Sequence, residues 1–93
     1  MDRPTEDVVV VRIYLQQDQN RREVLLRRLR DWGKVRGATF FHGVQGFGAQ
    51  HEGSSEPLVI EFFESAEKVD EALELLDDVV DPGHVVYWPA KLR

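Results

Sequence analysis

The chain has 93 residues, of which 42% are hydrophobic and 31% are charged, and its formal net charge is −5. This length predicts one small globular domain, and the acidic excess argues against a nucleic-acid-binding protein, which is usually basic. The absence of cysteine excludes disulfides, thiolate metal sites and cysteine nucleophiles. The sequence shows no signal-peptide pattern and no apolar run of membrane-spanning length, so we expect a cytoplasmic protein.

The first third of the chain predicts a strand followed by a helix. Residues 1–7 are expected to be a disordered tail. Residues 8–15 form a continuous, largely β-branched run with Arg12 as the only charge, which is typical of a buried central strand. Apolar residues then recur at helical spacing from Asn20, a candidate N-cap, to about residue 35.

The middle of the chain predicts two strands and a second helix. The strands cover residues 38–44 and 58–63. Ser65 can cap the helix that follows, whose apolar residues lie on one stripe. The sequence Asp-Pro-Gly at 81–83 stops this helix.

The last predicted strand, residues 85–92, completes the fold. Pro89 removes one backbone donor from this strand, which is tolerated best at the edge of a sheet. The order βαββαβ with right-handed crossovers predicts an α+β, ferredoxin-like fold: a four-stranded antiparallel sheet with both helices on one face. Residues 8–93 would then form a single domain.

The face of the sheet away from the helices can also be predicted, because side chains alternate along a strand. A monomer would expose a mostly apolar surface there, so we expect other copies of the chain to cover it. A partly solvated sheet is the alternative. The charged pair on this face, Arg12 and Glu61, is expected to meet across neighbouring strands. The face would carry Val8, Val10, Arg12, Tyr14, Val59, Glu61 and Phe63.

The two predicted helices carry opposite charge. Arginine dominates the first, and aspartate and glutamate dominate the second. Pairing within the chain or between subunits explains this pattern most simply. The ordinary alternative is that both charged surfaces are exposed to solvent and have no partner. Contact of the first helix with an acidic phospholipid or RNA is the remaining alternative.

A glycine-rich segment follows the second predicted strand, with glycines at 43, 46, 48 and 53. Glycine permits positive φ and close approach of the backbone, so amides in this segment can line a ligand. The same glycines can equally serve a structural turn.

The run GATFFHGVQGFG, preceded by VRIYL and followed by SSEPLVIEFFES, resembles the PII-like family of unknown function, relatives of the PII nitrogen-regulatory proteins. The resemblance implies a homotrimer of ferredoxin-like subunits that binds an adenine nucleotide or another small ligand in clefts between subunits. It also implies a protein or membrane-transporter target, docked by the loop after the second strand. The implied ligand-binding residues are Gly37, Thr39, Gly46, Phe47, Gly48 and Gln50.

The sequence departs from the family pattern at three places. Only AQHEGS separates Gly-Phe-Gly from Ser-Glu-Pro, so the docking loop looks truncated. DPGHVVYW lacks the glycine-rich, lysine-bearing segment that holds phosphates in PII proteins, and QQDQN replaces the usual Gly-Glu after the first strand. These departures weigh against ATP binding in the PII manner.

Candidate catalytic and metal-binding residues are few. The chain shows no catalytic triad and no phosphate-binding loop, and its three histidines have no metal-ligand spacing. We therefore expect a non-enzymatic trimeric regulator without a metal site. The alternatives are a trimeric scaffold that has lost ligand binding, and a small trimeric isomerase or hydrolase using His42 or Glu61.

Overall fold

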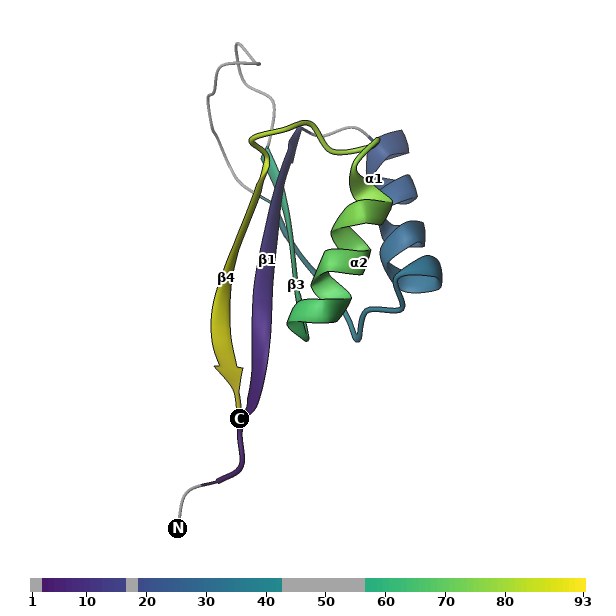
Figure 1. Cartoon of the computed structure of the whole chain (residues 1–93). Helices are drawn as coiled ribbons and strands as arrows, with labels where there is room; N and C mark the ends of the chain where they lie inside the picture. Colours follow the sequence, from purple (N-terminus) through teal and green to yellow (C-terminus); the bar gives the residue numbers. More distant parts are fainter. Residues whose placement is uncertain (1–2, 17–18, 43–56) are drawn as a thin grey trace.

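The structure, a computed structural model, describes residues 3–16, 19–42 and 57–93. A four-stranded antiparallel sheet carries two helical segments on one face (Figure 1). This is the α+β, ferredoxin-like fold that the sequence predicts. The strands are β1 (Glu6–Gln16), β2 (Thr39–His42), β3 (Pro57–Glu64) and β4 (Val85–Leu92). The helices are α1 (Gln19–Arg27), its π-helical continuation η1 (Arg28–Trp32) and α2 (Ala66–Leu76).

β1 lies in the interior of the sheet, as its continuous apolar sequence predicts. The strand order is β2-β3-β1-β4, so β1 pairs with both β3 and β4. β4 is an edge strand, which confirms the position expected from Pro89. β1 begins at Glu6, which pairs with Leu92, so residues 6 and 7 belong to the sheet and not to the tail expected over 1–7.

The first helix begins and ends earlier than predicted. Asn20 lies inside α1, so it is not the N-cap that its residue type indicated. η1 has wider turns, in which the Gly33 N–H donates to the carbonyl oxygen of Arg28 at 2.7 Å. Lys34 then adopts a left-handed conformation with φ of 52°, and the helix ends before residue 35.

The second helix begins as predicted and ends early. Ser65 accepts a hydrogen bond from the N–H of Lys68 at 3.3 Å, which confirms the N-cap. α2 ends at Leu76 and turns follow, so the helix stops before the Asp-Pro-Gly sequence at 81–83. No helix in the described part of the chain is long and apolar enough to cross a membrane.

The hydrophobic core lies between the helices and one face of the sheet. Phe62 and Ile13 contribute from β3 and β1, and Leu25 and Leu29 contribute from the first helix. Buried strand residues alternate with more exposed ones, as the two-residue period of a strand predicts. The other buried members are Val11, Leu15, Leu58, Ile60, Val69, Ala72, Leu76 and Val80.

The opposite face of the sheet, which we call the outer face, is partly exposed. Tyr14, Phe41 and Phe63 are exposed by 42%, 45% and 38%. Arg12 lies beside Glu61, with 3.3 Å between Arg12 Nε and Glu61 Oε2, so the expected cross-strand pair is confirmed. This face therefore presents aromatic side chains around a neutralised charge pair.

Candidate functional site

The ligand-binding residues predicted from the sequence are only partly described by the structure. Gly37 lies just before β2 and Thr39 is its first residue, and both are exposed. A Cβ atom added at Gly37 would meet no other atom within 4 Å, so the space beside this backbone is open. Outside the described residues lie Gly46, Phe47, Gly48 and Gln50.

A pocket of about 430 Å³ opens at the other edge of the sheet, where the chain passes from α2 to β4. Tyr87, which is 62% exposed, lines it together with Asp77 and Asp81. Gly83 adopts a φ of 85°, a conformation that favours glycine, and so forms the turn beside the pocket. The sequence indicated only a helix stop here, because the pocket depends on the gap between α2 and β4. Its apolar lining comes from Leu73, Leu76, Val80, Pro82 and Val85.

Thr39 and this pocket lie at the same height on opposite edges of the sheet. The strand register places Thr39 beside Glu61, which lies beside Arg12. Arg12 in turn lies beside Val86, and both neighbours of Val86 in β4 line the pocket. Two strands separate Thr39 from the pocket, so a single chain keeps them apart. A second copy placed edge to edge would bring the two edges to the same level, with the Thr39 side chain on the outer face beside Glu61 and the pocket on the helix-facing side, where Tyr87 lies beside Val11.

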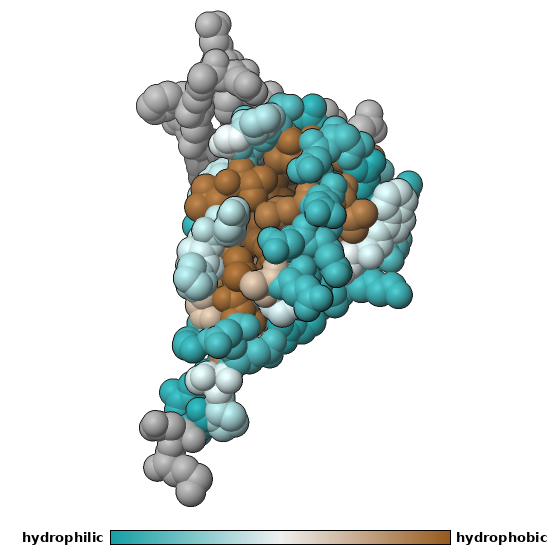
Figure 2. Space-filling view, viewed as in Figure 1, coloured by the Kyte–Doolittle hydropathy of each residue, from teal (hydrophilic) through white to brown (hydrophobic). Residues whose placement is uncertain are grey.

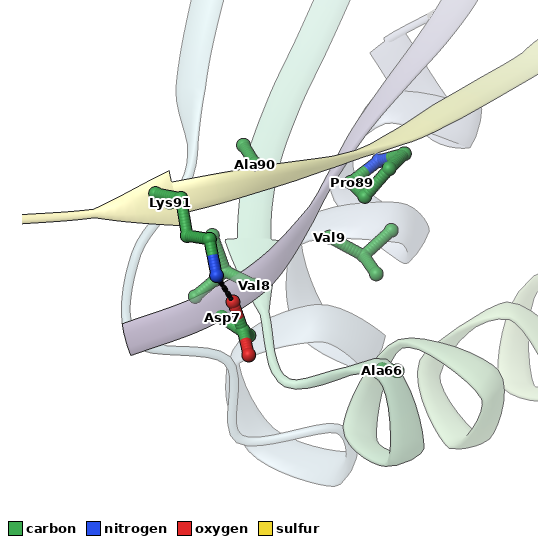
Figure 3. Close-up of a pocket in the computed structure, with 7 residues that line it drawn as sticks. All are labelled: Asp7, Val8, Val9, Ala66, Pro89, Ala90 and Lys91. Carbon is green, nitrogen blue, oxygen red and sulfur yellow. Dashed lines mark hydrogen bonds and ion pairs between the residues drawn. The ribbon is translucent and has the colours of Figure 1, made fainter. Parts of the chain in front are cut away.

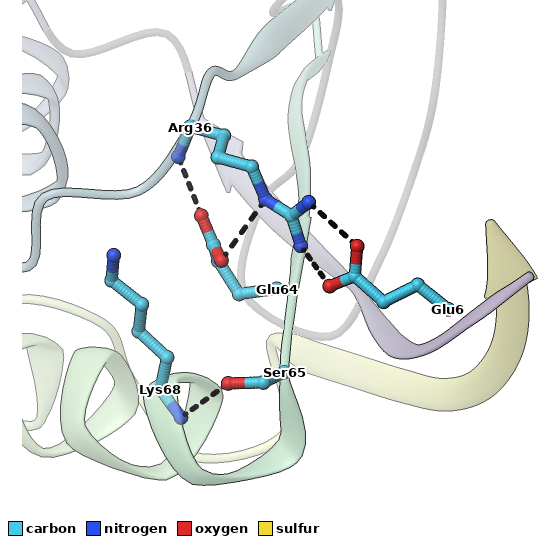
Figure 4. Close-up of polar contacts among 5 residues, drawn as sticks. All are labelled: Glu6, Arg36, Glu64, Ser65 and Lys68. Carbon is cyan, nitrogen blue, oxygen red and sulfur yellow. Dashed lines mark hydrogen bonds and ion pairs between the residues drawn. The ribbon is translucent and has the colours of Figure 1, made fainter.

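Arg36 holds the segment that leads into β2 (Figure 4). Its backbone N–H donates to Glu64 Oε2 at 2.6 Å, and its Nε donates to Glu64 Oε1 at 3.2 Å. Its two terminal nitrogens donate to the two carboxylate oxygens of Glu6 at 3.1 and 2.8 Å. The guanidinium also lies 5.5 Å from the centre of the Phe63 ring. These contacts fix Gly37, the next residue, relative to β1 and β3.

This Arg36 network (Arg36, Glu64 and Glu6) was not predicted from the sequence. Glu64 is 4% exposed and is the buried charged residue of the described core. The hydrogen bonds between Arg36 and Glu6 raise the pKa of Arg36 and lower the pKa of Glu6, so both groups are ionised near neutral pH. Its members lie 28 and 30 positions apart in the chain, a separation that no local sequence pattern records.

Arg12 occupies the middle of the outer face. Its guanidinium lies 5.8 Å from the centre of the Phe41 ring and 5.6 Å from that of Trp88. A hydrogen bond with Tyr14 and the charge of Glu61 raise the pKa of Arg12 above its usual value. A cation held between aromatic rings and a carboxylate is compatible with burial of this face against another protein surface.

The structure does not bring the two candidate catalytic residues together. Glu61 lies on the outer face and is paired with an arginine, whereas alternation along β2 places His42 on the helix-facing side. The Nδ1 atom of His84 lies 2.9 Å from the carbonyl oxygen of Tyr14, and His51 is outside the described residues. Within residues 3–16, 19–42 and 57–93, no group of three or more histidine, cysteine, aspartate or glutamate side chains is placed to hold a metal ion.

A family model confirms the relationship that the glycine-rich segment indicated. The model of DUF190, described as "Uncharacterized ACR", matches residues 8–92. The chain belongs to this family. No curated protein matches the sequence.

Solved structures share the fold of this DUF190 chain at low sequence identity. CPII from Thiomonas intermedia K12, in a structure with ADP and bicarbonate, is 20% identical with a TM-score of 0.75, over 96% of this chain and 91% of CPII. A second CPII structure, with ADP, AMP and bicarbonate, is 18% identical with a TM-score of 0.73, over 97% and 99%. The periplasmic divalent cation tolerance protein CutA from Archaeoglobus fulgidus is 11% identical with a TM-score of 0.63, over 89% and 81%. These similarities establish a PII-like fold.

Proposed function

We propose that the chain is a non-enzymatic, homotrimeric PII-like regulator that binds a small ligand at the junctions between subunits. The observation that carries this proposal is the position of the two candidate ligand-binding regions. Thr39 and the pocket beside Tyr87 lie at the same height on opposite edges of one sheet. A site that uses both regions extends around the joined edges, from Thr39 on the outer face to Tyr87 on the helix-facing side, and is complete only when the β2 edge of one copy meets the β4 edge of the next.

The outer face supports the proposed assembly. Phe41 and Phe63 are each more than a third exposed, and Arg12 at the middle of this face is already paired with Glu61. Packing this face against other copies removes apolar area from water without leaving the Arg12 charge unpaired. Edge-to-edge contact also covers the free edges of β2 and β4, which otherwise expose unpaired backbone groups.

An adenine nucleotide is the ligand class to test first, because the CPII structures contain ADP and AMP. Bicarbonate is the second candidate for the same reason. The pocket half on the β4 edge is lined by Asp77 and Asp81 and by no lysine or arginine that the structure describes. A nucleotide would therefore place its base, and not its phosphates, against this half.

A thermal-shift series with ADP, AMP and bicarbonate tests the proposal. A ligand at 100 times its Kd stabilises the native state by about 2.7 kcal/mol, which raises the melting temperature by several degrees. Gly37→Val and Tyr87→Ala should each abolish that shift, because one narrows the β2 side of the site and the other removes a wall of the β4 side. Gly37→Val adds a side chain that meets open space within the chain, so the fold should be kept.

Ala38→Val is the matched control, since it adds a similar side chain at the neighbouring exposed position. It should leave the shift unchanged. If ADP, AMP and bicarbonate produce no shift, or if Gly37→Val and Tyr87→Ala respond like the wild type, the ligand-binding role is wrong. A trimer without ligand response would then favour a scaffold that binds partner proteins.

A further inference from the structure

The helix layer covers the sheet unevenly. α2 packs on β1 and β3, while β4 extends beyond the helices (Figure 1). The residues that line two pockets mark a groove between α2 and β4. An apolar band follows this groove between the charged surface of α2 and β4 (Figure 2). The groove opens at one end into the 430 Å³ pocket and at the other into a pocket of about 470 Å³ beside Ala66 and Pro89 (Figure 3). The pair Asp7–Lys91 lies at this second opening.

The side of α2 along this groove has a regular pattern of charge. Leu73 and Asp77 line the loop-side pocket, and Ala66 lines the other one. Asp70 falls on the same stripe, because residues three and four apart share one side of a helix. In the described part of the chain, neither Asp70 nor Asp77 forms an ion pair. The groove therefore presents the sequence Asp–Leu–Asp to its surroundings.

The side of the first helix that faces away from α2 carries the complementary pattern. Arg22 lies over the ring of Phe40 at 5.4 Å, so this side of the helix faces the β2 edge. Leu26 and Arg30 follow at intervals of four residues and complete an Arg–Leu–Arg stripe. Arg30 contacts its neighbour Asp31 at 3.1 Å, an exposed pair that contributes little to stability.

The two stripes run in opposite directions along the chain. Arg21 contacts Asp81 at 3.6 Å, and Arg28 donates to the carbonyl oxygen of Leu75 at 2.8 Å, so α1 and α2 are antiparallel. Both stripes can be followed from the end of the layer near the α2–β4 loop. The first helix presents Arg22, Leu26 and Arg30 in that order, and α2 presents Asp77, Leu73 and Asp70. One stripe lies at the β2 side of the layer and the other at the β4 side. Copies arranged head to tail around an axis along the strands would bring them face to face.

We propose that the first helix of a neighbouring copy lies along the groove between α2 and β4. Its Leu26 packs against Leu73 and its Arg30 faces Asp70. Its Arg22 faces Asp77, so the helix borders the 430 Å³ pocket on the α2 side and leaves the ligand of the proposed function the side at Asp81 and Tyr87. This inference rests on the ring of subunits in the proposed function and assigns the lateral contact of that ring, which the outer face does not supply. The opposite charges of the two helices then serve the junction between subunits, beyond the Arg21–Asp81 and Arg28–Asp78 pairs within one chain.

Charge reversal with rescue tests this contact. The variant Arg22→Glu/Arg30→Glu, and separately Asp70→Arg/Asp77→Arg, places like charges at every junction. Each should raise the trimer dissociation constant at least tenfold in low salt, measured by sedimentation equilibrium, with unchanged circular dichroism of the subunit. The variant with all four changes restores opposite charges and should return the constant to within about threefold of wild type.

Glu67→Arg/Glu71→Arg is the matched control, because it changes the net charge equally on the solvent side of α2. It should leave the dissociation constant unchanged. If both reversals leave a wild-type trimer intact, or if the four changes fail to rescue, the helix–groove contact is wrong while the assembly stands. If the wild type is monomeric at every concentration, the proposed assembly itself is wrong, and this contact with it.

Cross-linking gives an independent measurement. The chain contains no cysteine, so Leu26→Cys/Leu73→Cys introduces a defined pair. The two positions lie on opposite sides of the helix layer of one chain, and a short bismaleimide should therefore give covalent dimers and trimers on a denaturing gel. Leu26→Cys/Glu71→Cys should remain monomeric on the gel. Equal cross-linking of both pairs, or of neither, would contradict the proposed orientation.

Discussion

The two faces of the sheet come from the same strands but have different physical characters. Phe62 and Phe63 are adjacent in β3, yet the first is 1% exposed on the helix-facing side and the second is 38% exposed on the outer face. The helix-facing side is closed by the protein's own helices. The outer face has aromatic rings around the Arg12–Glu61 pair and is covered by no helix of the described chain (Figure 1).

This difference shows that apolar composition alone does not define a core. A strand buried on both faces in the assembly looks like a continuous apolar run, which is the character of β1. The chain completes one side by folding, and in the proposed function the other side is left for association. Stability of the subunit and stability of the assembly should therefore respond to different residues, and the following variants separate them.

Phe62→Ala should have the largest effect on the subunit. Removing a fully buried phenylalanine leaves a cavity and should lower the free energy of unfolding by about 3–5 kcal/mol. Phe63→Ala, the matched change on the outer face, should cost the isolated subunit much less. Urea denaturation at low protein concentration measures both, and equal losses would contradict the contrast between the faces.

Val10→Asp should break the assembly while the subunit remains folded. Val10 lies between Phe63 and Trp88 in neighbouring strands, so a carboxylate there would be buried without a partner at the subunit contact. Light scattering should report three subunits for the wild type and one for the variant. Val10→Ala is the control and should remain trimeric. A trimer that tolerates the aspartate would show that the outer face is not the contact.

Glu64→Gln should weaken the subunit by about 1–3 kcal/mol, because one buried carboxylate accepts both the backbone N–H and the Nε–H of Arg36. Glu61→Gln changes an equivalent residue on the outer face and should cost less than about 1 kcal/mol in the monomer, since the Arg12 pair is more exposed. Denaturation curves of the two variants compare them directly. A greater loss at Glu61 would reverse the assignment of buried and outer faces.

The smallest expected effect is a pH dependence at Glu6. The hydrogen bonds from Arg36 hold the pKa of the Glu6 carboxyl below its unfolded-state value of about 4.3, so the stabilisation is present above that pH. It is lost as the pH falls through the folded-state pKa. Glu6→Gln should therefore flatten the fall in unfolding free energy below about pH 4.3. If the unfolding free energy of variant and wild type falls with the same slope as the pH is lowered, this contact has no stabilising role.

The local features of this protein are encoded in its sequence and could be predicted from it. Alternating side chains gave the two faces of the sheet and the Arg12–Glu61 pair, and Ser65 marked the start of α2. Composition and Pro89 placed β1 inside the sheet and β4 at its edge. Local signals were weaker at element ends: Asn20 is not a cap, and α2 ends before residue 81, because tertiary packing overrides capping and stop preferences.

Other features were decided by the tertiary structure alone. The Arg36 network joins the chain before β2 to the ends of β1 and β3, and the pocket beside Tyr87 exists because α2 does not extend over β4. From the sequence, the two helices could be recognised only as opposite in net charge. The arginine and aspartate stripes were located by the antiparallel packing of the helices, which places them on opposite sides of one layer. Such relations depend on strand register and layer order, which bring together residues that no local periodicity links.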